Sequence, residues 1–202
     1  MAQKSKQIVA AIIVVVCVAL VLGIKFYLEN RPVSALTGRF KGNPNARVKI
    51  IEYIDFQCPA CAAGSKYLQE RMKKNPDGIY LEMRYFPLAM HSHAFLSSRF
   101  AECASNQNKF WEFHDKLIDA QNEWSKQINA FPAFEVMAQE LNLDMNKLNI
   151  CLADSKVDQV INQHKDNGQK LGVKSTPTYF VNDKMVVGHK DLQKEINSIL
   201  GE

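Results

Sequence analysis

Two cysteines, Cys58 and Cys61, stand three positions apart where an apolar stretch gives way to a helical pattern. This spacing permits three kinds of chemistry: half of a metal site, a structural staple, or a working redox pair. Pro59 follows Cys58 directly, and proline is favoured in the first turn of a helix. Cys58 is therefore predicted at the N-terminal end of a helix, where unpaired backbone N–H groups and the helix dipole favour a thiolate.

Cys61 lies one turn further into that helix, where it can reach Cys58 to close a disulfide but is expected to be more buried. The helix dipole supplies only about 0.3–1 kcal/mol, which is less than one pKa unit. A strongly acidic Cys58 therefore also needs hydrogen bonds from the Cys61 thiol and from the first-turn N–H groups. Such a pair exchanges disulfides through a mixed disulfide on Cys58, which Cys61 resolves or re-forms.

A carboxylate, Glu52, precedes Cys58 by six positions on the strand that delivers the pair. Because side chains alternate along a strand, Glu52 shares one face with Ile54 and Phe56. Buried behind Cys61, this carboxylate could take and return the proton that disulfide exchange requires. The spacing is equally consistent with a strand-edge residue that faces water.

The strand that carries Glu52 is predicted over Val48–Phe56, a short β-branched and aromatic stretch that is typical of a buried central strand. The helix after it is predicted to run to about Lys74, before the turn residues Asn75–Gly78. A second strand, Ile79–Phe86, follows.

The middle of the chain shows apolar residues at helical spacing, and Asp144 and Asp154 are predicted N-caps of two of its helices. Two strands, Thr176–Asn182 and Met185–Gly188, and a helix from Asp191 complete the pattern. The order β-α-β, a helical block and β-β-α predicts an α/β sheet with a helical insertion.

The charge of the chain is concentrated at its start. The first 39 residues hold five basic residues and one acidic residue, and the other 20 basic and 20 acidic residues balance. A neutral body lacks the basic surface that nucleic acids require, so we expect no nucleic-acid binding.

The basic residues flank an uncharged apolar run, Ile8–Ile24, which residues 25–28 can extend. This length is close to the lower limit for a membrane helix. We favour an uncleaved signal anchor over a cleaved signal peptide, because no convincing small-residue cleavage site follows the run. Lysines before the run place the N-terminus in the cytoplasm and the body outside it, with Cys17 in the membrane.

Outside the cytoplasm disulfides persist, which changes the interpretation of the remaining cysteines. We favour a structural disulfide between Cys103 and Cys151, 48 positions apart on two predicted helices, over two buried free thiols. His91 and His93 could contribute to a metal site with the cysteines, but we favour helix-capping or surface roles and expect no metal.

The motifs as a set resemble the DsbA-like thiol-disulfide oxidoreductases, which are thioredoxin-fold proteins with a helical insertion. The resemblance covers roughly residues 40–200 and depends on the stretches EYIDFQCPAC, FPLAMHSHA, QNKFWEFHDKLI and KSTPTYFVND. A lone CxxC is a weak signal. CPxC after a strand, with Thr-Pro and another strand about 115 residues later, is a strong one.

The resemblance implies roles for individual residues. Pro177 is expected to be cis, and the Thr176 backbone is expected to pair with the client polypeptide beside the disulfide. Pro59 and Ala60 complete the predicted substrate-binding set. Glu52 matches the buried proton-transfer carboxylate of the family, and no cofactor is implied.

The direction of the exchange is less defined. The best-known oxidases of the family have His between Pro and the second Cys, whereas this chain has Ala60, which adds neither a donor nor a positive charge. We therefore expect a milder oxidant that makes disulfides in client proteins. The alternatives are a disulfide reductase or isomerase, or a copper- or zinc-handling protein with Cys58 and Cys61 as soft ligands. A net oxidase implies a membrane redox partner of the DsbB or vitamin K epoxide reductase type.

The resulting organisation is a monomer anchored in the cytoplasmic membrane through residues 8–28, with its catalytic domain in the periplasm or outside the cell. The predicted parts are the anchor (1–28), a tether (29–46), the first thioredoxin-like part (47–88), the helical insertion (89–172) and the second thioredoxin-like part (173–202).

Overall fold

The computed structural model of the chain describes residues 16, 18–20, 23 and 39–201. The chain divides into two compact units, Met1–Ala35 and Leu36–Glu202. Most of the predicted anchor, residues 8–28, and Cys17 within it lie outside the described residues. Within the described part of the chain, no helix has both the length and the apolarity needed to cross a bilayer.

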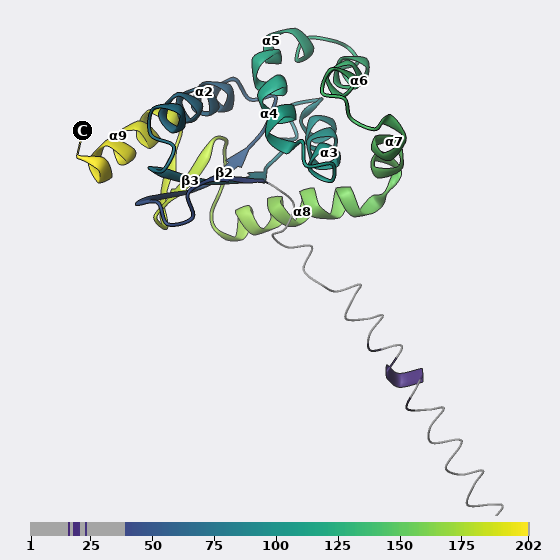
Figure 1. Cartoon of the computed structure of the whole chain (residues 1–202), viewed down its shortest axis with the longest axis horizontal. Helices are drawn as coiled ribbons and strands as arrows, with labels where there is room; N and C mark the ends of the chain where they lie inside the picture. Colours follow the sequence, from purple (N-terminus) through teal and green to yellow (C-terminus); the bar gives the residue numbers. More distant parts are fainter. Residues whose placement is uncertain (1–15, 17, 21–22, 24–38, 202) are drawn as a thin grey trace, which may run out of the picture. The chain divides into compact units, whose positions relative to one another are not determined.

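A five-stranded mixed sheet forms the centre of the second unit (Figure 1). The strand order is β1-β3-β2-β4-β5; β2 and β3 run parallel, and the other three pairings are antiparallel. Parallel neighbours need a crossover connection, which helix α2 supplies here. The strands are β1 (Phe40–Gly42), β2 (Val48–Ile54), β3 (Ile79–Tyr85), β4 (Thr178–Val181) and β5 (Lys184–Val187).

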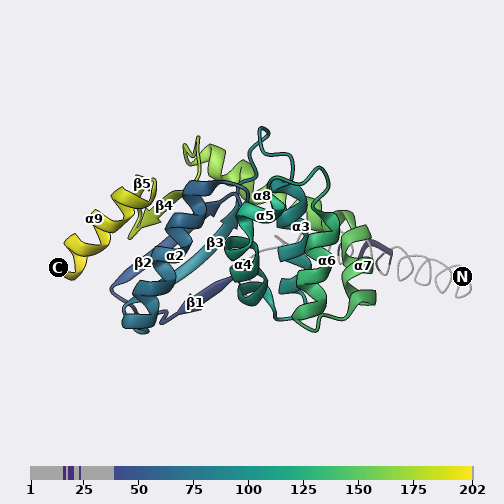
Figure 2. The same cartoon turned by 90° about the horizontal axis from the view of Figure 1, so that it is seen from above.

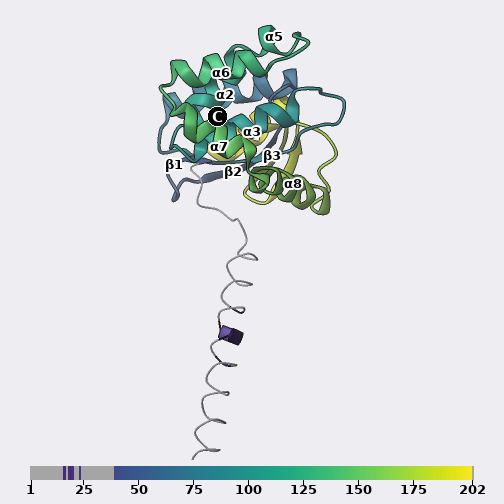
Figure 3. The same cartoon turned by 90° about the vertical axis from the view of Figure 1, so that its right-hand side faces the viewer.

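Helices lie on both faces of this sheet. Helices α2 (Pro59–Lys74) and α9 (His189–Leu200) cover one face, and α8 (Ser155–Lys170) lies against the other (Figures 1 and 3). The other helices pack as a group beside the sheet (Figure 2). They are α3 (Ala94–Ser105), α4 (Phe110–Asp119), α5 (Gln121–Trp124), α6 (Phe131–Glu140) and α7 (Met145–Ala153).

Strand β2 lies in the middle of the sheet because its side chains are apolar on both faces. Val48 and Ile50 pack in the core beneath α2, and Tyr53 packs on the opposite face. Helix α8 approaches that face closely at Gly168, where an added Cβ would lie 2.7 Å from the Tyr53 ring. A glycine is therefore needed at this crossing.

The predicted tether ends too late. The prediction assigned residues 29–46 to it, but residues 40–42 form β1, which pairs with β3, and both Arg39 and Ala46 are buried. A three-residue strand is too short to show a period of two. The predicted N-caps are confirmed, since the side chains of Asp144 and Asp154 accept backbone hydrogen bonds at the starts of α7 and α8.

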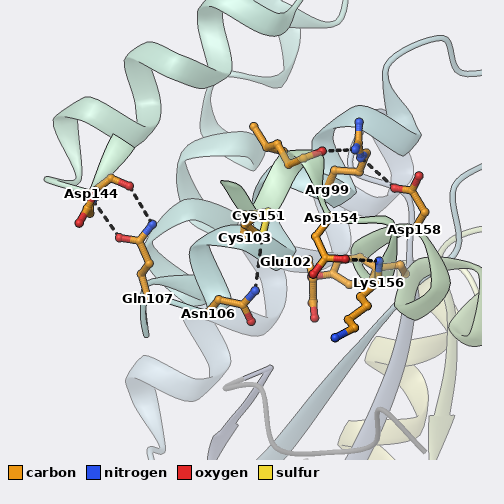
Figure 4. The surroundings of a disulfide bond; sticks show 12 residues. Arg99, Glu102, Cys103, Asn106, Gln107, Asp144, Cys151, Asp154, Lys156 and Asp158 are labelled. Carbon is orange, nitrogen blue, oxygen red and sulfur yellow. Dashed lines mark hydrogen bonds and ion pairs between the residues drawn. A yellow bond between two sulfur atoms is a disulfide. The ribbon is translucent and has the colours of Figure 1, made fainter. Parts of the chain in front are cut away.

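The helical group has its own aromatic core and a covalent link. Phe100, Phe134 and Trp124 pack edge to face, with ring centroids 5.1–5.4 Å apart. A disulfide joins Cys103 of α3 to Cys151 of α7, with 5.7 Å between their Cα atoms (Figure 4). In the chain-entropy model, closing a loop of this length stabilises the fold by about 4 kcal/mol.

Candidate active site

The cysteine pair lies at the junction of β2 and α2. Cys58 occupies the N-cap position of α2 with an extended backbone, and Pro59 stands in the first turn. The Cys58 carbonyl accepts hydrogen bonds from the Cys61 N–H (3.0 Å) and the Ala62 N–H (3.2 Å). A cysteine thus stands where Ser, Thr, Asp or Asn usually caps a helix, and its side chain makes no capping hydrogen bond.

The Cys58 thiol is strongly acidic. Its pKa is lowered to about 5, mainly by a hydrogen bond from the Cys61 thiol, with help from Thr176 and from the N–H groups of Cys61 and Ala60, against the opposing effect of burial. Only 8% of Cys58 is exposed, and its Sγ lies 3.4 Å from the Thr176 carbonyl oxygen. At neutral pH Cys58 is therefore a largely buried thiolate with several donors around it.

Cys61 behaves in the opposite way. It is fully buried, and burial, together with Cys58 and Glu52 nearby, raises its pKa well above the ordinary value for a thiol. Both cysteines are free thiols in this structure. One proton is thus held on the inner sulfur while the outer sulfur is ionised, which is the distribution that a nucleophile and its resolving partner need.

Glu52 lies beneath Cys61 on the α2 side of the sheet. It is 1% exposed, so the alternative of a water-facing strand-edge residue is wrong. Burial raises its pKa to about 8, and the nearby Tyr179 and Lys41 offset this only in part. Its Oε1 atom has no hydrogen-bond partner among the described residues. A carboxyl group in this state can hold a proton at neutral pH and release it to a neighbouring thiolate.

The loop before β4 brings the other predicted substrate-binding residues to the pair. The Thr176–Pro177 peptide bond is cis, and the Thr176 carbonyl faces Cys58. Pro59 and Ala60 are exposed at the start of α2. Thr176 therefore contacts Cys58 directly, and Pro59, Ala60 and Pro177 adjoin these two residues in the chain.

Two histidines, His91 and His93, lie close to the site. His91 Nδ1 lies 2.7 Å from the buried Asp55 carboxylate, which also accepts from the Leu88 and Gln57 N–H groups. His93 occupies the N-cap position of α3, as the helix-capping alternative predicts, but its side chain makes no cap. The side chain is buried instead, and its Nε2 contacts the Gln127 carbonyl at 2.8 Å. Among the described residues no cluster of three or more His, Cys, Asp or Glu could hold a metal.

Several aromatic residues near the pair belong to the core. Tyr53, Phe56 and Phe86 are at most 3% exposed, so they do not form an apolar substrate groove at the surface. Gln121, 63 positions from Cys58, was not predicted as a site residue, yet its side chain donates to the Cys58 carbonyl. No local sequence pattern predicts such a contact, because the contact depends on where the helical insertion packs against the sheet.

Comparison with known sequences identifies the chain over most of its length. A family model described as thioredoxin matches residues 34–200. The Na(+)/H(+) antiporter NhaA 3 of Salinispora tropica is 32% identical over 155 residues, which make up 76% of this chain and 23% of the antiporter. The chain spans about a quarter of the length of the curated relatives it matches.

Solved structures share the fold. A thioredoxin-like oxidoreductase from Silicibacter pomeroyi has a TM-score of 0.66 at 25% identity, covering 86% of this chain and 95% of its own. DsbA2 of Pseudomonas aeruginosa has a TM-score of 0.64 at 25% identity, covering 82% of this chain and 96% of its own. The predicted thioredoxin-like α/β fold is confirmed, and so is the resemblance to DsbA-like proteins. The chain therefore belongs to the thioredoxin family, as a DsbA-like member of it.

Proposed function

We propose that this protein forms disulfides in client polypeptides, with Cys58 as the exchanging sulfur, Cys61 as the resolving sulfur and Glu52 as the proton carrier. The observation that carries the proposal is the split between the two thiols, with a pKa of about 5 on Cys58 and a strongly raised pKa on the buried Cys61. Among disulfide exchange reactions, this split favours the release of Cys58 as the leaving thiolate.

In the oxidising direction, a client thiolate attacks Sγ of Cys58 in the Cys58–Cys61 disulfide. The sulfur–sulfur bond breaks, and Cys61 leaves as a thiolate that takes the proton of the neutral Glu52 carboxyl group. A second client thiolate then attacks the client sulfur of the mixed disulfide and releases Cys58 as a thiolate. Two electrons pass from the client to the pair, and the client gains one disulfide.

The acidity of Cys58 supports this direction. At pH 7 a thiol with a pKa of about 5 instead of 9.0 stabilises the reduced pair by about 3 kcal/mol, which corresponds to roughly 60 mV of oxidising power. That shift favours an oxidase over a reductase or an isomerase. Ala60 supplies no side-chain donor to the thiolate, so we place the protein below the strongest oxidases of its family.

The reduced pair must pass its two electrons to an acceptor. We propose a membrane partner of the DsbB or vitamin K epoxide reductase type, with the protein itself held at the membrane by residues 8–28 and its folded domain on the extracytoplasmic side. The uncharged run Ile8–Ile24 and the lysines before it support this arrangement. Cell fractionation and protease accessibility of the intact chain test it.

The central experiment traps the mixed disulfide between Cys58 and a client polypeptide. In a Cys61→Ser variant expressed in its native cell, the Cys58 thiolate should first exchange with an oxidised small thiol such as glutathione disulfide and release one glutathione thiolate. A client thiolate then displaces the second glutathione, and the resulting mixed disulfide between Cys58 and the client should accumulate because no resolving sulfur is present, whereas Cys58→Ser should accumulate none. The purified wild-type protein should oxidise reduced ribonuclease and equilibrate with glutathione in the oxidising range. Absence of any trapped polypeptide, or a Cys58 thiol that titrates like free cysteine, would overturn the proposal.

A further inference from the structure

A glutamine of the helical insertion holds the backbone on both sides of the exchanging cysteine. Gln121, the first residue of α5, is 5% exposed. Its Nε2 donates to the Phe56 carbonyl (2.6 Å) and to the Cys58 carbonyl (3.0 Å). Both amide hydrogens of the buried Gln121 side chain thus donate to the loop that carries Cys58.

A second glutamine makes the reverse connection. Gln57, between the two carbonyls, donates from Nε2 to the Ser125 carbonyl (3.2 Å) and accepts from the His93 N–H (2.6 Å). The loop between β2 and α2 is therefore attached to the insertion near the start of α3 and at both ends of α5. Because the partners lie 36 to 68 positions apart, these contacts form only when the insertion packs against the sheet.

The loop geometry that these contacts fix affects the stability of the Cys58 thiolate. The carbonyl of Cys58 also accepts hydrogen bonds from the Cys61 and Ala62 N–H groups of α2, so its position sets the orientation of the first helical turn. The N–H groups of Ala60 and Cys61 in that turn stabilise the Cys58 thiolate. Donors held in place before ionisation stabilise a charge without a reorganisation cost.

We propose that Gln121 is a positioning residue for Cys58: by holding the Phe56 and Cys58 carbonyls, it lets the helical insertion set the reactivity of the exchanging sulfur. This inference rests on the proposed disulfide exchange. Gln121 touches neither sulfur, so it acts through the backbone of the loop. A merely structural role predicts loss of stability alone, whereas a positioning role predicts altered thiol chemistry in the folded protein.

The test compares the full-length wild-type chain with Gln121→Met, which keeps the length of the side chain and removes both donors. The pKa of Cys58 is read from the alkylation rate and the thiolate absorbance across pH, and the redox equilibrium is read against glutathione. We expect the midpoint for Cys58 to rise by about one pH unit and the equilibrium constant to fall about tenfold, in the less oxidising direction. Gln121→His, which retains one donor, is expected to give an intermediate midpoint.

The matched control is Gln127→Met, the same change at an exposed position of the following loop. It should leave both readouts at their wild-type values. If Gln121→Met lowers the melting temperature but leaves the midpoint and the equilibrium unchanged, the positioning role is wrong. If Gln121→Met does not fold, a wild-type midpoint in Gln121→His overturns the inference in the same way. An ordinary thiol pKa in the wild-type protein would instead overturn the proposed function itself.

Discussion

Two buried glutamates in this protein have opposite surroundings. Glu52 lies beneath Cys61, and Glu102 lies in α3 beside the disulfide; they are 1% and 2% exposed. Glu102 accepts a hydrogen bond from the Arg39 guanidinium and another from the Tyr85 hydroxyl (2.9 Å). Glu52 has an oxygen with no hydrogen-bond partner among the described residues, and its pKa is raised to about 8.

The difference shows what pairing does to a buried carboxyl group. Burial alone favours the neutral form, so Glu52 holds a proton that Cys61 can take. Glu102 instead forms an ion pair with the Arg39 guanidinium and accepts from the Tyr85 hydroxyl, so it ties α3 to β3 and to the residue before β1. The same side chain therefore carries out proton transfer in one region under the proposed function, and it attaches elements to one another in the other region.

The largest expected effect is a loss of stability when the Arg39–Glu102 ion pair is broken. Arg39→Met leaves the Glu102 carboxylate buried without its cation, so we expect the free energy of unfolding to fall by about 3–5 kcal/mol. Urea denaturation at pH 7 measures this loss. The double variant Arg39→Met with Glu102→Leu should recover most of it, because apolar side chains of similar volume replace a buried pair at little cost.

A surface pair supplies the comparison for that experiment. Lys116 and Glu140 form an ion pair on α4 and α6 with both side chains partly exposed. Lys116→Met should change the free energy of unfolding by less than about 1 kcal/mol. An equally small change for Arg39→Met would show that the Glu102 carboxylate is not desolvated, and the contrast between the two glutamates would fail.

The next largest effect is on the rate of client oxidation, when the carboxyl group of Glu52 is removed. Glu52→Gln keeps the shape of the side chain and removes the proton carrier, so we expect the rate of client oxidation to fall about 100-fold, or about 3 kcal/mol in the barrier. Stopped-flow oxidation of a reduced peptide with two cysteines measures the rate. Glu102→Gln should lower stability without lowering the rate per folded molecule. Equal rates for wild type and Glu52→Gln would remove Glu52 from the mechanism.

The contrast between the two glutamates also shows which parts of the structure can be predicted from the sequence. Local patterns or the family motifs predict the cysteine pair, the strand of Glu52 and the cis Pro177 loop. They can do so because strand alternation and helix starts depend on residues that are neighbours in the sequence. The partners of Glu102 are not local: Arg39 is 63 positions away and precedes a three-residue strand that no pattern predicts.

The same limit applied to the active site itself. Spacing left Glu52 either buried or facing water, and only the packing of α2 over the sheet decided between them. Gln121 stood outside every motif that was assigned a role, since its partners are backbone carbonyls that have no sequence signature. Contacts between side chains and distant backbone therefore account for most of what the sequence analysis did not find.

The smallest expected effect tests Glu52 and Cys58 together through the pH dependence of stability. Glu52 has a raised pKa, so the folded state binds more protons than the unfolded state between about pH 4.5 and 8, and its contribution to stability is lost as the pH rises. Cys58 has a lowered pKa, so in the reduced protein its contribution is absent below about pH 5 and grows towards pH 9.0. The two groups oppose each other in the reduced protein.

Oxidation of the pair removes the Cys58 contribution and leaves that of Glu52. The free energy of unfolding of the reduced protein, minus that of the oxidised protein, should therefore rise by about 2 kcal/mol between pH 5 and pH 7. Urea unfolding of both forms measures the difference, with the Cys103–Cys151 disulfide kept intact and verified by mass. Cys58→Ala should follow the slope of the oxidised form. Parallel curves for the reduced and oxidised proteins would mean that the Cys58 thiol is not acidic, because charged groups common to both forms cancel in this difference.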